Sequence, residues 1–515
     1  YQAQSDAVRN DSFNWNTTLN EAMDKTGGNA SFVVSAGDQI QTTKKKSPGK
    51  SEMTSEIEYT GYLSPDVLKS LPVATTVGNH DADNANYTYH FNTPNSSDLG
   101  SNGVVGGDYY FTYGNTLFMM LNTQDTNAAE HKQFMEQAIA ANPNCTWRVV
   151  TLHQDIYGSA EHSNEPEITN LRYTLVPYFE ANDVDVVLTG HDHAYSRTHI
   201  LEGGHKTVEY TDDEFDAELD KDMDAGENPA TRYEAPANIS TDSKEPADVA
   251  YLNYLNAVMD KDAIEDTEKG ETVVNPDGIL YMTANSSSGS KYYDLVPRMQ
   301  SYIANRWQED VPTYSVIDVT DNTFTINTYR TDNDQKIDET FTIKKGVTED
   351  IKSASVGKVK NQIYTGKQIQ PALKVTLNGK TLKAGKDYTV TYTDNKNTGL
   401  AKATINGIGK YTGTQTVTFK IVPKKAVLKT VKAGKSGTAT VTIGKAGGKV
   451  SGYAIQVSTD SSFKKVTTYR TAKTTYALKN LSKGKTYYVR VKAFTKVSEK
   501  NVYGAASKTI KVKAK

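Results

Sequence analysis

Four short apolar runs in the first part of the chain each stop at polar residues that can bind metal ions. The runs with the residues that follow them are Phe32–Ala36 with Asp38, Val73–Val77 with Asn79 and His80, Val149–Leu152 with His153, and Val184–Thr189 with His191 and His193. Short apolar runs that end abruptly are typical of buried strands. Further strand-like runs are Leu117–Leu121 and Ile279–Thr283, and helix-like stretches are Trp15–Lys25, Ala128–Ala141 and Thr169–Ala181. This alternation predicts an α/β fold with a central sheet.

The position of the polar residues predicts that they meet in space. In open α/β sheets the carboxyl ends of the strands gather at one edge, where ligands bind. Asp38 is a carboxylate that can bridge two ions, and imidazoles with an amide oxygen suit zinc, iron or manganese. Two ions about 3.5–4 Å apart can polarise a phosphoryl group and stabilise both the attacking and the leaving oxygen. A histidine outside the ligand set can protonate the departing alcohol.

These motifs resemble the calcineurin-like metallophosphoesterases, and among them the purple acid phosphatase branch. The stretches that carry the resemblance are Gly37-Asp38, Gly78-Asn79-His80-Asp81, the isolated His153, Gly190-His191-Asp192-His193-Ala194-Tyr195-Ser196-Arg197 and 284–293. The resemblance covers residues 1–345. It implies a metallophosphoesterase β-sandwich flanked by helices, with metal-dependent hydrolysis of phosphate esters by a dinuclear centre of Fe, Zn or Mn.

The resemblance also implies a role for each site residue. Asp38 would bridge both metals. Asn79, His153 and His191 would complete one site, and His193 would belong to the other. His80 would face the substrate as general acid or stabiliser of the transition state. Asp81, Tyr195 and Arg197 receive no role.

Two positions depart from the family pattern. The family's first motif, an aspartate with His, Gln or Gly two residues later, should end an early strand, but Asp6 is followed by Val8 with no strand before it. We expect this motif upstream of Tyr1, with Asp6 as a substitute being the alternative; the second metal site would then be incomplete. The tyrosine that colours purple members falls three residues after the bridging aspartate, where this chain has Gln41. We therefore expect no purple charge-transfer band.

Charge divides the chain sharply. Residues 1–345 hold 24 Lys and Arg against 55 Asp and Glu, whereas residues 346–515 hold 34 against 6, giving net charges of −31 and +28. This break predicts separately built halves. The lysines of the second half are spread along strand-like segments and do not cluster with aromatics on one motif. We therefore expect a solvated surface, or one that faces an anionic cell wall, and no nucleic acid partner.

Alternating segments with recurrent turn signals predict two all-β sandwich modules after Lys345. Residues 349–422 resemble a bacterial Ig-like repeat, through Tyr364-Thr365-Gly366-Lys367, Gly385-Lys386-Asp387-Tyr388 and Gly409-Lys410-Tyr411-Thr412-Gly413. Residues 423–515 resemble fibronectin type III, with Tyr453 at a core position and Leu481 followed by Tyr487 as its tyrosine corner. Neither module shows a catalytic cluster.

Several features bound the function. The acidic stretch 203–273 predicts an insertion that is partly helical and partly loop. Asp220, Asp222 and Asp224 alternate before Gly226, which resembles a calcium loop, but a solvated helix end is the preferred interpretation. No run reaches the ~18 apolar residues of a membrane span. Cys145, the single cysteine, is expected to be a small packed side chain.

The predicted function is hydrolysis of phosphomonoesters by a secreted or cell-surface enzyme resembling acid phosphatases. The acidic body favours small monoesters over long polyanions. One alternative is a phosphodiesterase or nucleotidase with the same metals. The other is a surface adhesin whose phosphatase body is degenerate, an interpretation that the missing first motif and Gln41 favour slightly.

Overall fold

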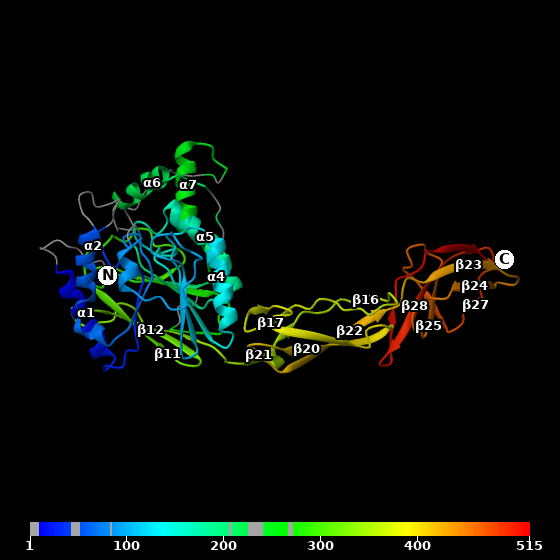
Figure 1. The fold of residues 1–515 in the computed structure, drawn as a ribbon. Helices are drawn as coiled ribbons and strands as arrows, with labels where there is room; N and C mark the ends of the chain where they lie inside the picture. Colours follow the sequence, from blue (N-terminus) through cyan, green and yellow to red (C-terminus); the bar gives the residue numbers. More distant parts are fainter. Residues whose placement is uncertain are drawn as a thin grey trace. The chain divides into compact units, whose positions relative to one another are not determined.

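The computed structural model describes residues 10–42, 52–82, 85–204, 206, 209–224, 240, 242–265 and 271–515. The chain divides into two compact units, Tyr1–Lys345 and Gly346–Lys515. Helices are confined largely to the first unit, whereas strands build the second (Figure 1). Each unit is described by itself.

A seven-stranded sheet forms the centre of the first unit. Its order is β10-β7-β9-β6-β5-β4-β3. The bounds are β3 (Tyr109–Tyr113), β4 (Thr116–Met120), β5 (Trp147–Thr151), β6 (Val186–Thr189), β7 (Tyr195–Leu201), β9 (Ile279–Thr283) and β10 (Ile303–Trp307). Strands β4, β5, β6 and β9 run parallel to one another. Their carboxyl ends therefore lie at one edge of the sheet.

Both faces of this sheet are covered, which explains the continuous apolar runs in its strands. On one face Met119 and Val150 pack with helices α4 (Ala128–Ala141) and α5 (Pro166–Ala181). Figure 1 shows these two helices side by side. On the other face Phe118 and Val149 pack against a four-stranded sheet. That sheet has the order β11-β12-β13-β8, with bounds β11 (Thr313–Val319), β12 (Thr323–Arg330), β13 (Phe341–Lys344) and β8 (Thr272–Val274).

Two further parallel strands carry the earliest motifs. Strand β1 (Val33–Ser35) pairs with β2 (Val73–Thr75). The helices near them are α1 (Asp11–Lys25), α2 (Glu52–Leu63) and α3 (Asn86–His90), with the short 3₁₀ turn η1 (Asp66–Lys69). Trp15 of α1 stacks on Tyr62 of α2, with ring centroids 5.5 Å apart, so these two helices pack together beside the strands.

The acidic stretch between β7 and β9 contains two helices, α6 (Asp212–Asp224) and α7 (Pro246–Val258), and the 3₁₀ turn η2 (Lys261–Ala263). Phe215 and Leu219 of α6 pack against Tyr254 of α7 in a small apolar cluster. The hydroxyl of Tyr254 donates to the buried Asp222 at 2.7 Å. Asp222 is fully buried at this contact between the helices, so the expectation of a solvated helix end is wrong for this residue. Gly226, which completed the resemblance to a calcium loop, lies outside the described residues.

The second unit holds two successive β-structures. The first contains β14 (Glu349–Asp350), β15 (Ser355–Val356), β16 (Gln362–Ile363), β17 (Val375–Leu377), β18 (Lys380–Leu382), β19 (Tyr388–Thr393), β20 (Gly399–Gly407), β21 (Tyr411–Thr412) and β22 (Thr414–Val422), with the 3₁₀ turn η3 (Ile351–Ser353). Its larger sheets have the orders β15-β17-β18 and β16-β22-β20-β19.

The second structure is a sandwich of three and five strands, ordered β23-β24-β27 and β26-β25-β28-β29, with β30 also pairing β28. Its strands are β23 (Val427–Ala433), β24 (Ala439–Gly444), β25 (Gly452–Ser458), β26 (Thr467–Thr471), β27 (Thr475–Leu478), β28 (Thr486–Val497), β29 (Lys500–Tyr503) and β30 (Ile510–Lys513). The Tyr487 hydroxyl accepts from the backbone N–H of Ser482 at 3.0 Å, which is the geometry of a tyrosine corner. Tyr453 is buried, and its hydroxyl accepts from the backbone N–H of Ala446.

The predicted fold class is confirmed: an α/β body with a β-sandwich flanked by helices precedes two all-β sandwich modules. Among the described residues, no helix is long and apolar enough to cross a membrane.

Candidate metal centre

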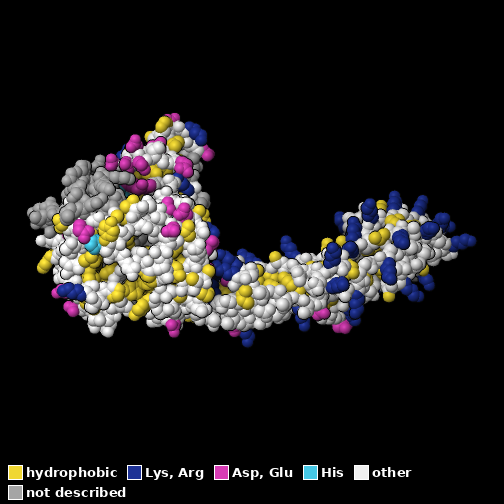
Figure 2. All heavy atoms as spheres, in the orientation of Figure 1, with side chains coloured by type: hydrophobic (Ala, Val, Ile, Leu, Met, Phe, Trp, Pro, Cys, Tyr) yellow, Lys and Arg dark blue, Asp and Glu magenta, His cyan; other side chains and the backbone are white. Residues whose placement is uncertain are grey.

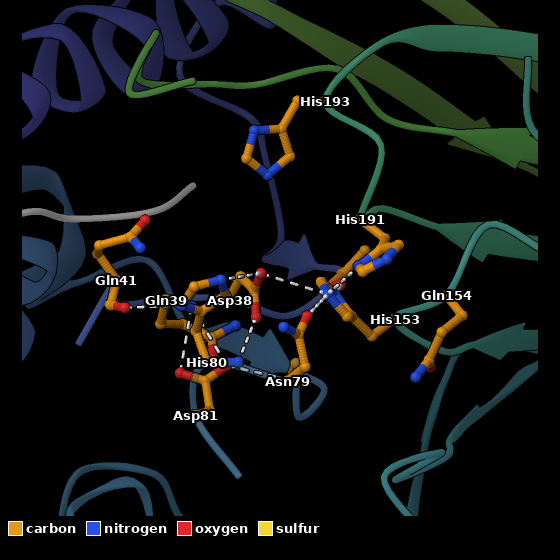
Figure 3. A network of polar contacts seen from close by, with 12 residues as sticks. Asp38, Gln39, Gln41, Asn79, His80, Asp81, His153, Gln154, His191 and His193 are labelled. Carbon is orange, nitrogen blue, oxygen red and sulfur yellow. Dashed lines mark hydrogen bonds and ion pairs between the residues drawn. The ribbon is translucent and has the colours of Figure 1, made fainter. Parts of the chain in front are cut away.

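The ends of parallel strands bring the predicted residues together. His153 follows β5 and His191 follows β6, while Asp38 and Asn79 follow β1 and β2. The two groups of strands are tied at this edge, because the Nδ1–H of His153 donates to the carbonyl of Ala36 at 2.7 Å. Figure 3 shows the side chains of 38, 79, 80, 153 and 191 gathered in one place.

The Nε2 atom of His153 is the centre of this cluster. It lies 3.0 Å from Asn79 Oδ1. It lies 3.1 Å from His191 Nδ1 and 3.3 Å from Asp38 Oδ2. Since Nδ1 of His153 carries a hydrogen toward a carbonyl, Nε2 of the neutral ring has only a lone pair. The oxygen atoms of Asn79 and Asp38 therefore face a nitrogen that can only accept. This arrangement is unfavourable unless a cation lies among the three atoms.

The spacing of these atoms fits ligands of a shared ion. Nitrogen and oxygen ligands about 2.1 Å from one ion lie roughly 3.0–3.4 Å from one another. The three distances from His153 Nε2, between 3.0 and 3.3 Å, fall in that range. No group of three or more His, Cys, Asp or Glu side chains within the described ranges could hold a metal ion by itself. The amide oxygen of Asn79 is a fourth donor atom of the cluster, 3.0 Å from His153 Nε2.

Backbone carbonyls fix the tautomer of three histidines. The Nδ1–H of His80 donates to the carbonyl of Gln41 at 2.6 Å, and that of His193 donates to Lys291 at 3.0 Å. His153 makes the equivalent bond to Ala36. Each ring thus keeps its Nε2 lone pair for a ligand or a proton, which is the usual outer support of metal-binding histidines.

Three residues of the proposed site have left-handed backbone conformations. Asp38, His191 and His193 have φ angles of 52°, 70° and 49°. Such angles are costly for residues other than glycine and persist where the surroundings enforce them. A Cβ on Gly78 would collide with the carboxylate of Asp38, and one on Gly37 would collide with the ring of His153. Glycine at these two positions therefore allows the loops to approach closely.

A buried carboxylate, Asp81, holds the first two loops together. It accepts from the backbone N–H of Gly78 at 3.0 Å and from that of Gln39 at 3.2 Å. The hydroxyl of Tyr59 also donates to it, at 2.9 Å. Burial, followed by the charge of Asp38, raises the pKa of Asp81. Asp81 had no predicted role, although its place in the second motif was the available signal.

A second buried carboxylate anchors the loop that carries His191 and His193. Asp192 accepts from the backbone N–H of His162 at 3.1 Å and lies 2.6 Å from the hydroxyl of Ser163. The same hydroxyl lies 2.6 Å from Asp155, and all three side chains are buried. Burial and the charge of Asp192 raise the pKa of Asp155 well above its ordinary value. This network joins the loop after β6 to the loop after β5.

His193 stands apart from the other donors. Figure 3 shows its ring separated from the group around His153. It still lines the same cavity as Asp38, His153 and His191, whose volume is about 750 Å³. Residues of β1 and β11 also line this cavity. Among the described strands, β1 pairs only with β2, and β11 pairs only with β12. Burial lowers the pKa of His193 to about 3.

Two residues that the sequence analysis did not select lie beside His193 and His191. The ring of Tyr293 is 5.4 Å from His193 and 4.6 Å from His162. The ring of His162 is in turn 5.7 Å from His191. Tyr293 lies in the stretch 284–293 that carried part of the resemblance, which was the available signal. No local pattern in the sequence marked His162.

The charges of the cluster favour a positive occupant. Burial would raise the pKa of Asp38, but His153 and His80 hold it well below its ordinary value. Burial opposes a charge on His153, yet Asp38 raises the pKa of that imidazole. Burial and His153 together lower the pKa of His191 well below the usual range. The carboxylate of Asp38 therefore attracts a cation to the cluster, and the lone pairs of the neighbouring side chains can coordinate a metal ion.

The remaining polar residues of the fourth motif contact a distant aspartate. Arg197 donates through Nε to Asp338 at 2.6 Å, and the hydroxyl of Tyr195 donates to it at 2.7 Å. Asn305 adds a third bond, at 2.6 Å. Burial would raise the pKa of Asp338, but Arg197 outweighs burial and lowers it. These residues brace strand β7 against the loop before β13.

Other sequence positions are placed away from the cluster. His90 pairs with Glu56 at 2.9 Å and His131 with Asp108 at 2.7 Å. Gln41, by contrast, lies beside the cluster, since its carbonyl accepts from the ring of His80, and its backbone N–H donates to Glu58 at 3.2 Å. Asp6 and His205 lie outside the described residues.

Comparison with known proteins gives two family matches. Residues 12–195 match the calcineurin-like phosphoesterase model, and residues 428–509 match the fibronectin type III domain model. Two uncharacterized Mycobacterium tuberculosis proteins, from strains CDC 1551 and H37Rv, are 26% identical over 156 residues. Each match covers 26% of this chain and 29% of the relative, so the matched region spans less than a third of these relatives.

Two solved structures resemble larger parts of the chain. A purple acid phosphatase from yellow lupin (Lupinus luteus) seeds is 14% identical and has a TM-score of 0.40, covering 64% of this chain and 49% of its own. The GAP50 anchor of the inner membrane complex of Plasmodium is 12% identical with a TM-score of 0.36, covering 65% and 84%. The phosphoesterase model match supports metal-dependent hydrolysis of phosphoesters as the class of reaction.

Proposed function

We propose, from the premise that this chain carries a calcineurin-like phosphoesterase domain followed by a fibronectin type III domain, that it hydrolyses phosphate esters at a centre of two metal ions. The observation that carries the proposal is the convergence on His153 Nε2. Three donor atoms, from Asp38, Asn79 and His191, lie between 3.0 and 3.3 Å from it. The residues come from four separate strand ends, and packing alone gives no reason for them to meet.

In this proposal Asn79, His153 and His191 hold the first ion, and Asp38 bridges to the second. His193 is the other described donor for the second ion. When bound, two metals would polarise the phosphoryl group and supply a nucleophile at neutral pH.

His80 is the proposed general acid. Its backbone N–H donates to Asp38 Oδ1 at 2.9 Å, and its ring Nε2 lies 4.0 Å from Asp38 Oδ2. The Nδ1–H bond to Gln41 orients the ring and leaves Nε2 as the atom that gives up or accepts a proton. A side chain that is 10% exposed beside the cluster can reach a leaving oxygen without serving as a ligand.

The preferred substrates are small phosphomonoesters. Residues 1–345 have a net charge of −31, which opposes the approach of a long polyanion. Turnover of a chromogenic monoester should exceed that of the matched diester at physiological salt. A preference for the diester would favour the phosphodiesterase or nucleotidase alternative.

Metal content tests the proposal most directly. Elemental analysis of the full chain, before and after chelation, should show Fe, Zn or Mn, and hydrolysis should disappear and return with the metal. A metal-free protein that cannot be loaded, with no hydrolysis, would favour the alternative of a non-catalytic surface adhesin.

A secreted or cell-surface location is also proposed. A fibronectin type III domain at residues 428–509 is compatible with that location, and the C-terminal modules would provide contact with the cell wall or surface. Fractionation of the source cells, with detection of the chain in the medium or on intact cells, tests this location.

A further inference from the structure

The five-stranded sheet of the fibronectin type III module has one face directed away from the core. Val489, Val491 and Val512 are core residues, so their sequence neighbours on β28 and β30 point outward. The outward set contains a sixth cation, Lys496, that pairs with Glu499, and five others: Arg470, Arg490, Lys492, Lys511 and Lys513. Of these five, Arg470, Lys511 and Lys513 are exposed, and the other two are partly exposed.

The strand register arranges these cations in a diagonal row. Ala454 of β25 lies between Arg470 and Lys492 in neighbouring strands. Arg490 is two residues from Lys492 along β28, and Lys511 is opposite Tyr488, the next outward position. Outward residues of one strand are roughly 7 Å apart, and adjacent strands are about 4.8 Å apart. The row therefore offers regularly spaced charges to an extended polymer.

No carboxylate neutralises this row within the described part of the chain. The module has only two acidic residues, Asp460 and Glu499. Asp460 accepts from the backbone N–H groups of Ser462 and Lys464 in a turn, and Glu499 pairs with Lys496 at 2.8 Å. Figure 2 shows Lys and Arg side chains over this unit with few acidic ones. The positive potential of the face is thus uncompensated, and like charges held close together favour an anionic partner.

Most aromatic rings near the row offer no open face to a stacking base, and the single ring within the row, Tyr488, is only partly exposed. Phe463 and Phe494 are 8% and 9% exposed. The guanidinium of Arg490 lies over the ring of Phe463 at 4.0 Å, and Tyr503 packs against Phe494 with centroids 5.7 Å apart. Single-stranded nucleic acids gain much of their affinity from open aromatic faces. The face therefore suits an anionic polymer that lacks bases.

We propose that this row of five cations binds an acidic polysaccharide, which holds the enzyme at a carbohydrate surface. The site lies in a different module from the metal centre and does not depend on the hydrolytic activity. Its recognition is by charge and spacing along an extended chain, so the affinity should fall steeply with salt.

The test measures binding of the full-length protein to fluorescent polygalacturonate by anisotropy at several salt concentrations. The triple variant Lys492→Glu, Lys511→Glu and Lys513→Glu should bind at least tenfold more weakly than the unsubstituted chain. The matched control is Lys429→Glu, Lys432→Glu and Lys479→Glu, which changes the net charge equally at exposed positions outside the row. The control should weaken binding less than twofold. Thermal unfolding must show that both triple variants keep the module folded.

Three results would overturn the proposal. Equal losses in the two triple variants would show attraction by overall charge instead of a site. Tighter binding of single-stranded DNA than of polygalacturonate would replace the polysaccharide with a nucleic acid. If the unsubstituted chain does not bind at low salt, a polyanionic partner for this face is excluded.

Discussion

The two units of this chain place their charged groups differently. In the described part of the first unit, buried acids, histidines and arginines are numerous, and they include Asp38, Asp81, His153, Asp192 and Asp338. In the second unit, Asp387 is the only buried residue of these types. Burying a charge costs free energy unless partners compensate it. Buried charged groups therefore reduce the stability of the first unit, which contains the proposed site. The second unit has almost no such groups.

Left-handed backbone angles also have different consequences in the two units. In the first unit, left-handed angles at Asp38, His191 and His193 fall on proposed ligands. In the second unit, Asn378 has a φ angle of 49° and lies in a turn, where asparagine tolerates this conformation. Strain at turns serves chain reversal, whereas strain beside buried carboxylates positions side chains. The comparison predicts that substitutions in the two units will separate activity from stability.

The largest effect is expected from His153→Ala. Its Nε2 is the centre of the donor cluster, so the variant should lose bound metal, and phosphoester turnover should fall by more than about a hundredfold. Elemental analysis and turnover are measured together. His80→Ala is the contrast, because it should lose turnover with its metal still bound. Loss of metal in the His80 variant would contradict the assignment of that residue as an acid.

The next effect is expected from Asp338→Asn. Removing one partner of a buried ion pair costs about 3–5 kcal/mol, because the charge of Arg197 is left without its carboxylate. Denaturant unfolding of the first unit would measure the loss.

The same residue predicts an acid limit for the first unit. The pKa of Asp338 is lowered in the folded state, so its contribution to stability is present above the unfolded pKa of about 3.9 and is lost as the pH falls through the folded pKa. Below about pH 4 the difference between the parent and Asp338→Asn should shrink. A difference that stays constant down to the lowest pH would show that the carboxylate charge is not what stabilises the unit.

A smaller effect is expected from Asp192→Asn. The amide keeps the size of the side chain but weakens the bonds to the Ser163 hydroxyl and the His162 backbone. Because those bonds anchor the loop of His191 and His193, turnover should fall by about ten- to a hundredfold. Metal affinity should fall with it while the unfolding midpoint stays close to the parent. Unchanged metal affinity would show that the loop holds its conformation without this anchor.

The smallest effect is expected from Ile455→Val in the second unit. Ile455 is fully buried in the core of the fibronectin type III module, and removing one methylene costs about 1 kcal/mol. The unfolding of that module should shift with no change in turnover or metal content. A parallel loss of activity would show that the two units are coupled, which would contradict the separation of activity from stability.

Much of the first unit could be predicted from local sequence. The helix over 128–141 begins and ends where its pattern predicted, and strand β9 spans the predicted 279–283. The apolar runs could be recognised as strands in the sequence, because both faces of the seven-stranded sheet are buried. The strands β10–β13 were not predicted, since half-exposed strands such as β11 show mixed patterns that short-range periodicity does not resolve.

The sequence by itself determined which residues could be ligands, because carboxylate, amide and imidazole groups follow strand ends in a recognisable order. It also determined the separation into an acidic and a basic half. Only the tertiary structure decided that His162 and Tyr293 lie beside His191 and His193, and that Asp338 binds Arg197. These contacts join residues from different loops and strands, some of them more than a hundred positions apart. Local patterns carry no information about such pairs, because their distance depends on how the sheets and loops pack.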